Sequence, residues 1–212
     1  MAWKYATLKA AIGSYLQNSE TTFVDTYIDV AIKQAEDRIS KSVILPANRK
    51  YGPIVLTNGS TTADLPTDFL APFELRISDA GDFTHVDYSD VSFLRSAYPN
   101  PLMVGVPRWY SMFDATTIIL APTPTTGLTG WLNYFHKPES IVTASTSWLG
   151  SNAENCLLYG CLAEAYTFLK GDADLMKLYE EKYQVALGDL KKLGEGMDMG
   201  DAYRMSERRE PR

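Results

Sequence analysis

The chain has 212 residues, and its 26 aspartates and glutamates outnumber its 20 lysines and arginines, giving a formal net charge of -6. This length suffices for one domain or two small ones, with a core that needs neither disulfides nor metals. The acidic balance argues against a free-standing DNA-binding protein, because such proteins present basic residues to the phosphate backbone.

Two amphipathic helices are predicted near the N-terminus. The first covers residues 5–16, where apolar side chains recur at intervals typical of a helix. The second covers residues 23–42, with one apolar stripe formed by Val24, Ile28, Ala31, Ala35 and Ile39. The N-terminus lacks the long apolar run of a secretory signal or membrane span, so we expect folding in a reducing cytoplasm.

The middle of the chain is predicted to be rich in β-structure, because proline, glycine and threonine increase and helical periodicity mostly disappears. The Asn58-Gly59 pair is typical of a tight turn and predicts a hairpin between residues 54–56 and 61–65. Further strands are expected at residues 74–77 and 84–88, paired as a hairpin across residues 79–81, at residues 108–113 and 117–120, joined at Asp114-Ala115, and at residues 129–138. A single helical turn is expected at residues 67–72 and a short helix after Asp90.

A helical hairpin is predicted at residues 152–194. Its first helix is apolar on nearly every side and should be buried, whereas its second has one apolar and one charged face. Gly171 and Asp172 are expected to cap the two helices where they meet. Residues 195–212 are rich in glycine and charge and are expected to be a flexible tail.

These elements predict an α+β fold in which both ends of the chain contribute to one body. Residues 1–47 and 152–194 are expected to form a four-helix body, and residues 48–151 a β-rich insertion domain. Cys156 and Cys161 lie five residues apart on a predicted helix and are interpreted as buried apolar side chains, not as a disulfide.

No catalytic or phosphate-binding motif is found in the sequence, so neither enzymatic activity nor a cofactor is expected. One acidic cluster could in principle hold a divalent ion, through Asp79, Asp82, His85, Asp87 and Asp90. Its spacing lacks the features of a calcium loop, and aspartate and glycine are common in hairpin turns and at helix N-termini. We therefore interpret the cluster as structural and predict no metal site.

The order and spacing of several motifs resemble the head-to-tail adaptor (connector) proteins of tailed bacteriophages. The matching stretches are LKAAIGSYLQN at 8–18, FVDTYIDVAIKQAEDRISKS at 23–42, LPTDFL at 65–70, GVPRWYSMFDATTIILAPTP at 105–124 and WLGSNAENCLLYGCLAEAYTFL at 148–169. Each motif is weak alone, and together they span most of the chain up to about residue 193.

The resemblance implies a structural protein of the virion neck, made in the host cytoplasm. It implies a homo-oligomeric ring, usually a dodecamer, that binds the portal protein above and a tail or nozzle protein below. Genomic DNA would pass through the lumen without sequence-specific binding, and no membrane is involved. Acidic side chains facing the lumen would repel the phosphates of the passing DNA. The interface candidates are Trp109, Tyr110, Trp131, Tyr203, Arg204, Arg208 and Arg209.

Two alternatives remain open from the sequence. The first is a tail-associated carbohydrate- or receptor-binding module in which Trp109, Tyr110 and Trp131 stack on a ligand, although aromatic residues more often fill cores and subunit contacts. The second is a hydrolase with a carboxylate or metal site within residues 79–90.

Overall fold

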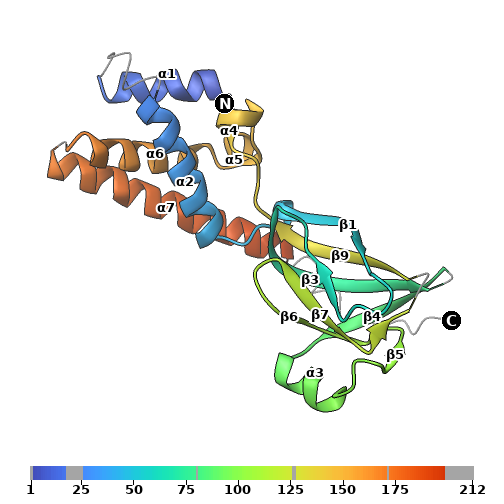
Figure 1. Ribbon diagram of the computed structural model, residues 1–212. Coiled ribbons are helices and arrows are strands. Elements are labelled where there is room, and N and C mark those ends of the chain that lie inside the picture. Colours follow the sequence, from blue (N-terminus) through green and yellow to red (C-terminus); the bar gives the residue numbers. More distant parts are fainter. Residues whose placement is uncertain (1, 18–25, 80, 126–127, 171, 199–212) are drawn as a thin grey trace. The chain divides into compact units, whose positions relative to one another are not determined.

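The computed structural model describes residues 2–17, 26–79, 81–125, 128–170 and 172–198. The chain divides into two compact units: a helical unit of residues 1–47 and 138–212, and a sheet unit of residues 48–137. Helices and a large curled mixed sheet confirm the predicted α+β class (Figure 1).

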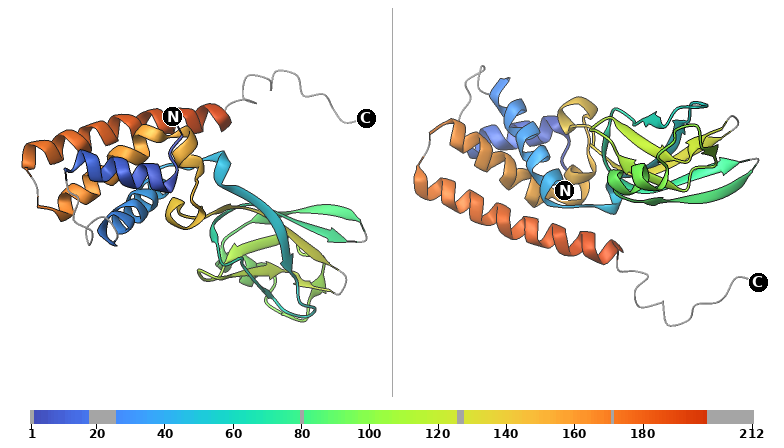
Figure 2. Two further views of the ribbon diagram at one scale, coloured as in Figure 1. Left: turned by 90° about the horizontal axis from the view of Figure 1, so that it is seen from above. Right: turned by 60° about the horizontal axis from the view of Figure 1, so that its bottom comes forward.

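The helical unit is built around α6, which packs against α1, α2 and α7. Figures 1 and 2 show α7 running alongside α6. None of the helices in the described part of the chain is both long and apolar enough to cross a membrane. The helices of this unit are α1 (Tyr5–Tyr15), α2 (Ile28–Ser42), α4 (Ile141–Ala144), α5 (Trp148–Asn152), α6 (Glu154–Phe168) and α7 (Ala173–Asp198).

The apolar stripes predicted for α2 and α6 form much of this unit's core. On α2 the buried residues include Ile28, Ala31, Ala35 and Ile39, as predicted, whereas Val24 lies outside the described residues. On α6, Leu157, Cys161 and Leu162 are fully buried, which confirms that this helix is central. Phe168, at the end of α6, is 53% exposed and stacks on Tyr27 with ring centroids 4.1 Å apart.

The C-terminal helix continues beyond its predicted end. Helix α7 runs to Asp198 and therefore includes Gly194 and the first residues of the predicted tail. A Cβ atom at Gly194 would lie 3.2 Å from the carbonyl oxygen of Ile44, so glycine permits α7 to pass close to the chain after α2. This glycine serves a close approach within the helix and does not end it.

Two short helices, α4 and α5, lie between β9 and α6 in the chain. Serine caps each of them: Ser140 accepts a hydrogen bond from the Val142 amide, and Ser147 accepts one from the Gly150 amide. Each contact satisfies an amide that the first helical turn leaves without an intrahelical partner. The predicted cap at Asp172 is also present, because its carboxylate accepts a hydrogen bond from the Asp174 amide at 2.8 Å, whereas Gly171 lies outside the described residues.

The sheet unit contains one seven-stranded sheet in the order β1-β9-β3-β4-β6-β7-β2 (Figure 1). All neighbours are antiparallel except β4 and β6. The strands are β1 (Arg49–Val55), β2 (Thr62–Asp64), β3 (Phe69–Asp79), β4 (Asp82–Tyr88), β6 (Trp109–Met112), β7 (Thr117–Ala121) and β9 (Thr129–His136). A small parallel pair joins β5 (Val104–Gly105) to β8 (Thr123–Pro124), and α3 (Val91–Ala97) packs against β6 and β7.

Two predicted strand pairings are confirmed. Strands β3 and β4 form an antiparallel pair that turns at Gly81, whose φ of 98° suits glycine. Strands β6 and β7 also pair antiparallel. The predicted helix after Asp90 is α3, and the Asp90 side chain accepts a hydrogen bond from the Ser92 amide.

Two other predictions for this region are wrong. Residues 54–56 and 61–65 do not form a hairpin, because β1 pairs with β9 and β2 pairs with β7. Gly59 does adopt a φ of 74°, so the turn is present. A turn does not determine which strands form hydrogen bonds with each other, and here the partner strands lie far away in the sequence. The helical turn predicted at 67–72 is instead the start of β3, where register shifts on either side of Pro72 accommodate the proline in a strand.

Candidate functional site

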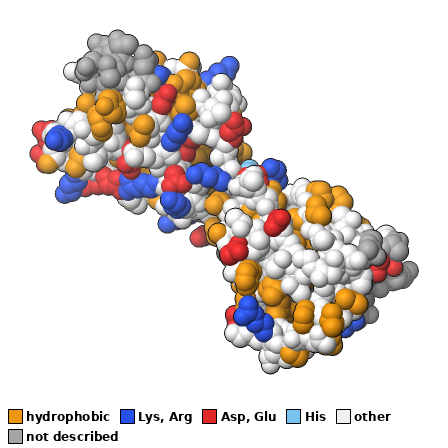
Figure 3. All heavy atoms as spheres, in the orientation of Figure 1, with side chains coloured by type: hydrophobic (Ala, Val, Ile, Leu, Met, Phe, Trp, Pro, Cys, Tyr) orange, Lys and Arg blue, Asp and Glu red, His pale blue; other side chains and the backbone are white. Residues whose placement is uncertain are grey.

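The outer face of the sheet carries a series of aromatic side chains across β1, β9 and β3. Strand alternation explains this, because Leu132 and Tyr134 of β9 are buried in the core while Trp131 and Phe135 point to the other face. Tyr51 of β1 stacks on Trp131 with centroids 5.2 Å apart and an interplanar angle of 16°. These side chains form a packed aromatic surface that remains partly open to solvent. In the view of Figure 3, hydrophobic side chains are exposed in several places on the sheet unit.

Two arginines lie against this aromatic surface. The Arg49 guanidinium lies 4.2 Å from the ring centroid of Phe73 and 5.4 Å from that of Phe135, and those two aromatic rings meet edge to face. The Arg76 guanidinium lies 5.7 Å from the ring centroids of both Tyr51 and Phe83. Cation–π contacts of this kind hold an arginine in place against the aromatic rings. We call this surface the arginine–aromatic face, made by Arg49, Tyr51, Phe73, Arg76, Trp131 and Phe135.

Carboxylates and one histidine border the arginine–aromatic face. Glu74 lies 3.5 Å from Arg76 Nε and 3.5 Å from His85 Nδ1, and His85 Nε2 lies 3.5 Å from Asp87. Within the described residues, no group of three or more His, Cys, Asp or Glu side chains is arranged to hold a metal ion. The predicted cluster is instead divided, because Asp90 caps α3 and Asp79 faces Asp82 at the end of the β3–β4 hairpin.

The structure separates the aromatic interface candidates from one another. Trp131 lies on the arginine–aromatic face, whereas Trp109 of β6 packs edge to face on Phe93 of α3 with centroids 5.3 Å apart. Tyr110 points to the opposite side of β6, is only 3% exposed, and burial raises its pKa to about 12. Two strands, β3 and β4, lie between β9 and β6, so the three predicted residues do not form one stacking platform for a sugar. The remaining candidates, Tyr203, Arg204, Arg208 and Arg209, lie outside the described residues.

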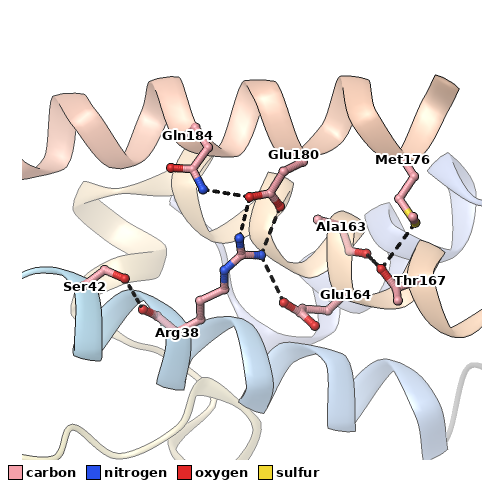
Figure 4. Close-up of polar contacts among 8 residues, drawn as sticks. All are labelled: Arg38, Ser42, Ala163, Glu164, Thr167, Met176, Glu180 and Gln184. Carbon is pink, nitrogen blue, oxygen red and sulfur yellow. Dashed lines mark hydrogen bonds and ion pairs between the residues drawn. The ribbon is translucent and has the colours of Figure 1, made fainter. Parts of the chain in front are cut away.

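A second polar cluster joins three helices of the helical unit. The Arg38 guanidinium of α2 makes a bidentate contact with Glu180 of α7 and donates a hydrogen bond to Glu164 of α6 at 3.2 Å (Figure 4). Gln184 donates to Glu180 at 2.7 Å. The same guanidinium lies 4.4 Å from the ring centroid of Tyr183. These contacts fix the relative positions of α2, α6 and α7, so we call Arg38, Glu164, Glu180 and Gln184 the three-helix brace.

Glu36 of α2 performs a similar role at the start of α4. Its Oε1 atom accepts a hydrogen bond from the Ile141 amide at 2.9 Å. Burial raises the pKa of Glu36, and the contacts with Ser140, Ile141 and Lys33 only partly oppose this effect. The carboxylate therefore caps a helix, but its partial removal from water disfavours its charged form.

Replacing Glu36 with glutamine is expected to stabilise the helical unit by about 0.5–1 kcal/mol at pH 7, because the amide keeps the acceptor without burying a charge. A raised folded-state pKa means that Glu36 opposes folding most when it is ionised. The wild-type protein should therefore lose stability as the pH rises above 4.5, the usual value, through the raised pKa. The variant should lack this part of the pH dependence.

Urea unfolding followed by far-ultraviolet circular dichroism at pH 4.5 and pH 7.5 tests this expectation. Glu36→Ala is the matched control, because it removes both the charge and the acceptor for the Ile141 amide. This control should be less stable than Glu36→Gln at both pH values. Equal stability of the two variants would show that the cap has no energetic role.

In the described residues, the fold thus brings together a stacked aromatic surface on the sheet unit and an ion-paired cluster on the helical unit. A family model described as SU10 adaptor protein matches residues 3–209. The chain therefore belongs to the SU10 adaptor protein family, and the resemblance to phage head-to-tail adaptors is confirmed. This is a family of structural adaptors and not a known class of enzymes. No curated protein matches the chain.

Proposed function

We propose that copies of this protein form a ring beneath the portal of a tailed phage, join the head to the tail, and let the genome pass through the lumen. The match to the adaptor family over residues 3–209 carries this proposal. The ring is proposed to be a dodecamer located in the virion neck, as the family resemblance implies. Its partners would be the portal protein on one side and a tail or nozzle protein on the other.

A ring of identical subunits requires two different surfaces on each subunit, because head-to-tail contacts close only when one surface fits the other. The described residues offer more than one such surface. The arginine–aromatic face lies on the sheet unit, and the helical unit exposes Val30, Lys33 and Gln34 on α2. The acidic composition supports a lumen that repels DNA phosphates, which would let DNA pass without adhering.

Mixing the purified protein with the portal protein of the same phage is expected to produce a complex of one portal and one adaptor ring. Mass photometry measures the mass of that complex, and electron microscopy of the same sample shows the ring and its position. Each protein alone is the control. Persistent absence of a joint complex at micromolar concentrations would contradict the proposal.

A shortened chain that ends at Asp198 tests the part of the proposal that concerns the C-terminal candidates. We propose that Tyr203, Arg204, Arg208 and Arg209 contribute to portal attachment. The shortened chain keeps the whole of α7 and should unfold at the same urea concentration as the full chain. It should bind portal more weakly in the same mass measurement, and unchanged binding would remove these four residues from the interface.

A further inference from the structure

We propose that the arginine–aromatic face receives the acidic end of the β3–β4 hairpin from the next copy of this chain in the ring. The inference rests on the proposed ring and assigns two surfaces that form one contact between neighbouring subunits. One surface carries guanidinium groups among aromatic rings, and the other carries two exposed carboxylates.

The arginine–aromatic face has the chemistry of a protein contact surface. Tyr51 is 48% exposed and Phe73 is 49% exposed, although both are already held by stacking or cation–π contacts. Aromatic residues and arginines are enriched in protein interfaces, where rigid side chains lose little conformational freedom on binding. This surface is therefore organised before a partner arrives.

The two guanidinium groups of the face favour an acidic partner. Arg49 and Arg76 provide two positive charges among the aromatic rings, and the carboxylates of Glu74 and Asp87 lie at the border of the face. The whole chain is acidic, with a net charge of -6, so the two guanidinium groups are complementary to carboxylates that another copy exposes. Charge complementarity thus favours a second copy as the occupant.

The end of the β3–β4 hairpin is the most specific acidic feature of the sheet unit. Asp79 and Asp82 are directly opposite each other in the strand register, and both are exposed. Like charges at directly opposed positions destabilise a strand pair. A guanidinium from a neighbouring subunit placed near both carboxylates would attract each of them and offset the repulsion between them.

The arginines of the same chain are not placed for this role. Arg76 is opposite Trp131 on one side and His85 on the other, and its Nε atom lies 3.5 Å from Glu74. Asp79 lies three residues further along β3, or about 10 Å at the usual rise of a strand. The face and the hairpin end are thus different parts of one sheet.

Charge reversal at one position on each surface tests the contact. Arg76→Glu on the face, or Asp82→Lys on the hairpin, is expected to raise at least about tenfold the protein concentration needed for half-maximal ring formation with the portal. Combining both substitutions in one chain should restore assembly, because the reversed charges attract again. Asp82→Lys also places a positive charge opposite Asp79 in its own chain, so this variant keeps a stable hairpin.

Two matched controls carry the same charge changes at exposed positions away from the proposed contact. They are Arg108→Glu before β6 and Asp64→Lys on β2. Both should form rings at the wild-type concentration. Thermal unfolding of every variant checks that the sheet unit remains folded.

The outcomes separate this inference from the proposed function. If the wild-type chain forms no ring with the portal, the proposed function fails. If the wild-type ring forms and both reversals assemble normally, or the combined variant assembles no better than the single ones, only this inference is overturned. The inference is also overturned if the reversals change binding to a DNA duplex but leave ring formation unchanged. The face would then bind a polyanion and not a neighbouring subunit.

Discussion

Replacing Arg38 with methionine is expected to lower the free energy of unfolding of the helical unit by about 2–3 kcal/mol. Within the three-helix brace, Arg38 of α2 links the three helices, because it contacts both Glu164 on α6 and Glu180 on α7. Methionine keeps the apolar stem but leaves the two glutamates facing the same region without their cation. The side chain of Arg38 is 35% exposed, so water reduces the loss below that of a fully buried pair.

Lys177→Met is the matched control for this prediction. Lys177 also forms an ion pair across one turn, 3.9 Å from Glu181, but its side chain is 77% exposed. Its replacement should change stability by less than about 0.5 kcal/mol, as is usual for a surface pair. Urea unfolding monitored by circular dichroism at 222 nm measures both variants, and equal losses would show that the brace contributes no more than a surface ion pair.

The brace also predicts an acid dependence. Burial raises the pKa of Glu180, but the hydrogen bonds from Arg38 and Gln184 outweigh it, so the pKa is lowered overall. A lowered folded-state pKa contributes stability that is present above pH 4.5, the usual value, and is lost as the pH falls through the lowered pKa. In Arg38→Met this contribution should be missing, so the difference in stability between the two proteins should shrink in acid.

Local sequence patterns predicted most elements of this fold because each element is determined by its own residues. The buried stripe of α2, the apolar helix α6, the Asp90 cap and the Gly81 turn all follow from side-chain periodicity or backbone requirements within a few residues. The pairing of β1 with β9 depends on residues about eighty positions apart. The Asn58-Gly59 pattern predicts only the turn, and for this reason the hairpin assigned to it was wrong.

The candidate surfaces were predicted only in part. The tryptophans at 109 and 131 were visible in the sequence as strand aromatics, but alternation along β6 does not identify its core face, because the neighbouring Tyr110 and Ser111 are both buried. Arg49 and Arg76 gave no signal, because their significance depends on aromatic partners that other strands supply. The brace was missed for the same reason, since Arg38 lies more than one hundred residues from Glu164 and Glu180.

Tyr183→Ala is expected to have the largest effect on stability, a loss of about 3–5 kcal/mol, because it opens a cavity in the core of the helical unit. Tyr183 of α7 is fully buried. Gly160 of α6 makes room for it, since a Cβ atom there would lie 3.2 Å from Tyr183 Cε2. The aromatic ring also supports Arg38, so the alanine variant should weaken the brace as well.

Tyr183→Phe separates the contribution of the aromatic ring from that of the hydroxyl. The hydroxyl is buried and forms no hydrogen bond with the described residues, and the pKa of Tyr183 is raised to about 12, mainly by burial. Removing an unsatisfied buried hydroxyl should leave stability unchanged or increase it by up to about 1 kcal/mol. Urea unfolding of both variants measures the difference. A loss in Tyr183→Phe approaching that of Tyr183→Ala would show that the hydroxyl, and not the packing between α6 and α7, holds this core together.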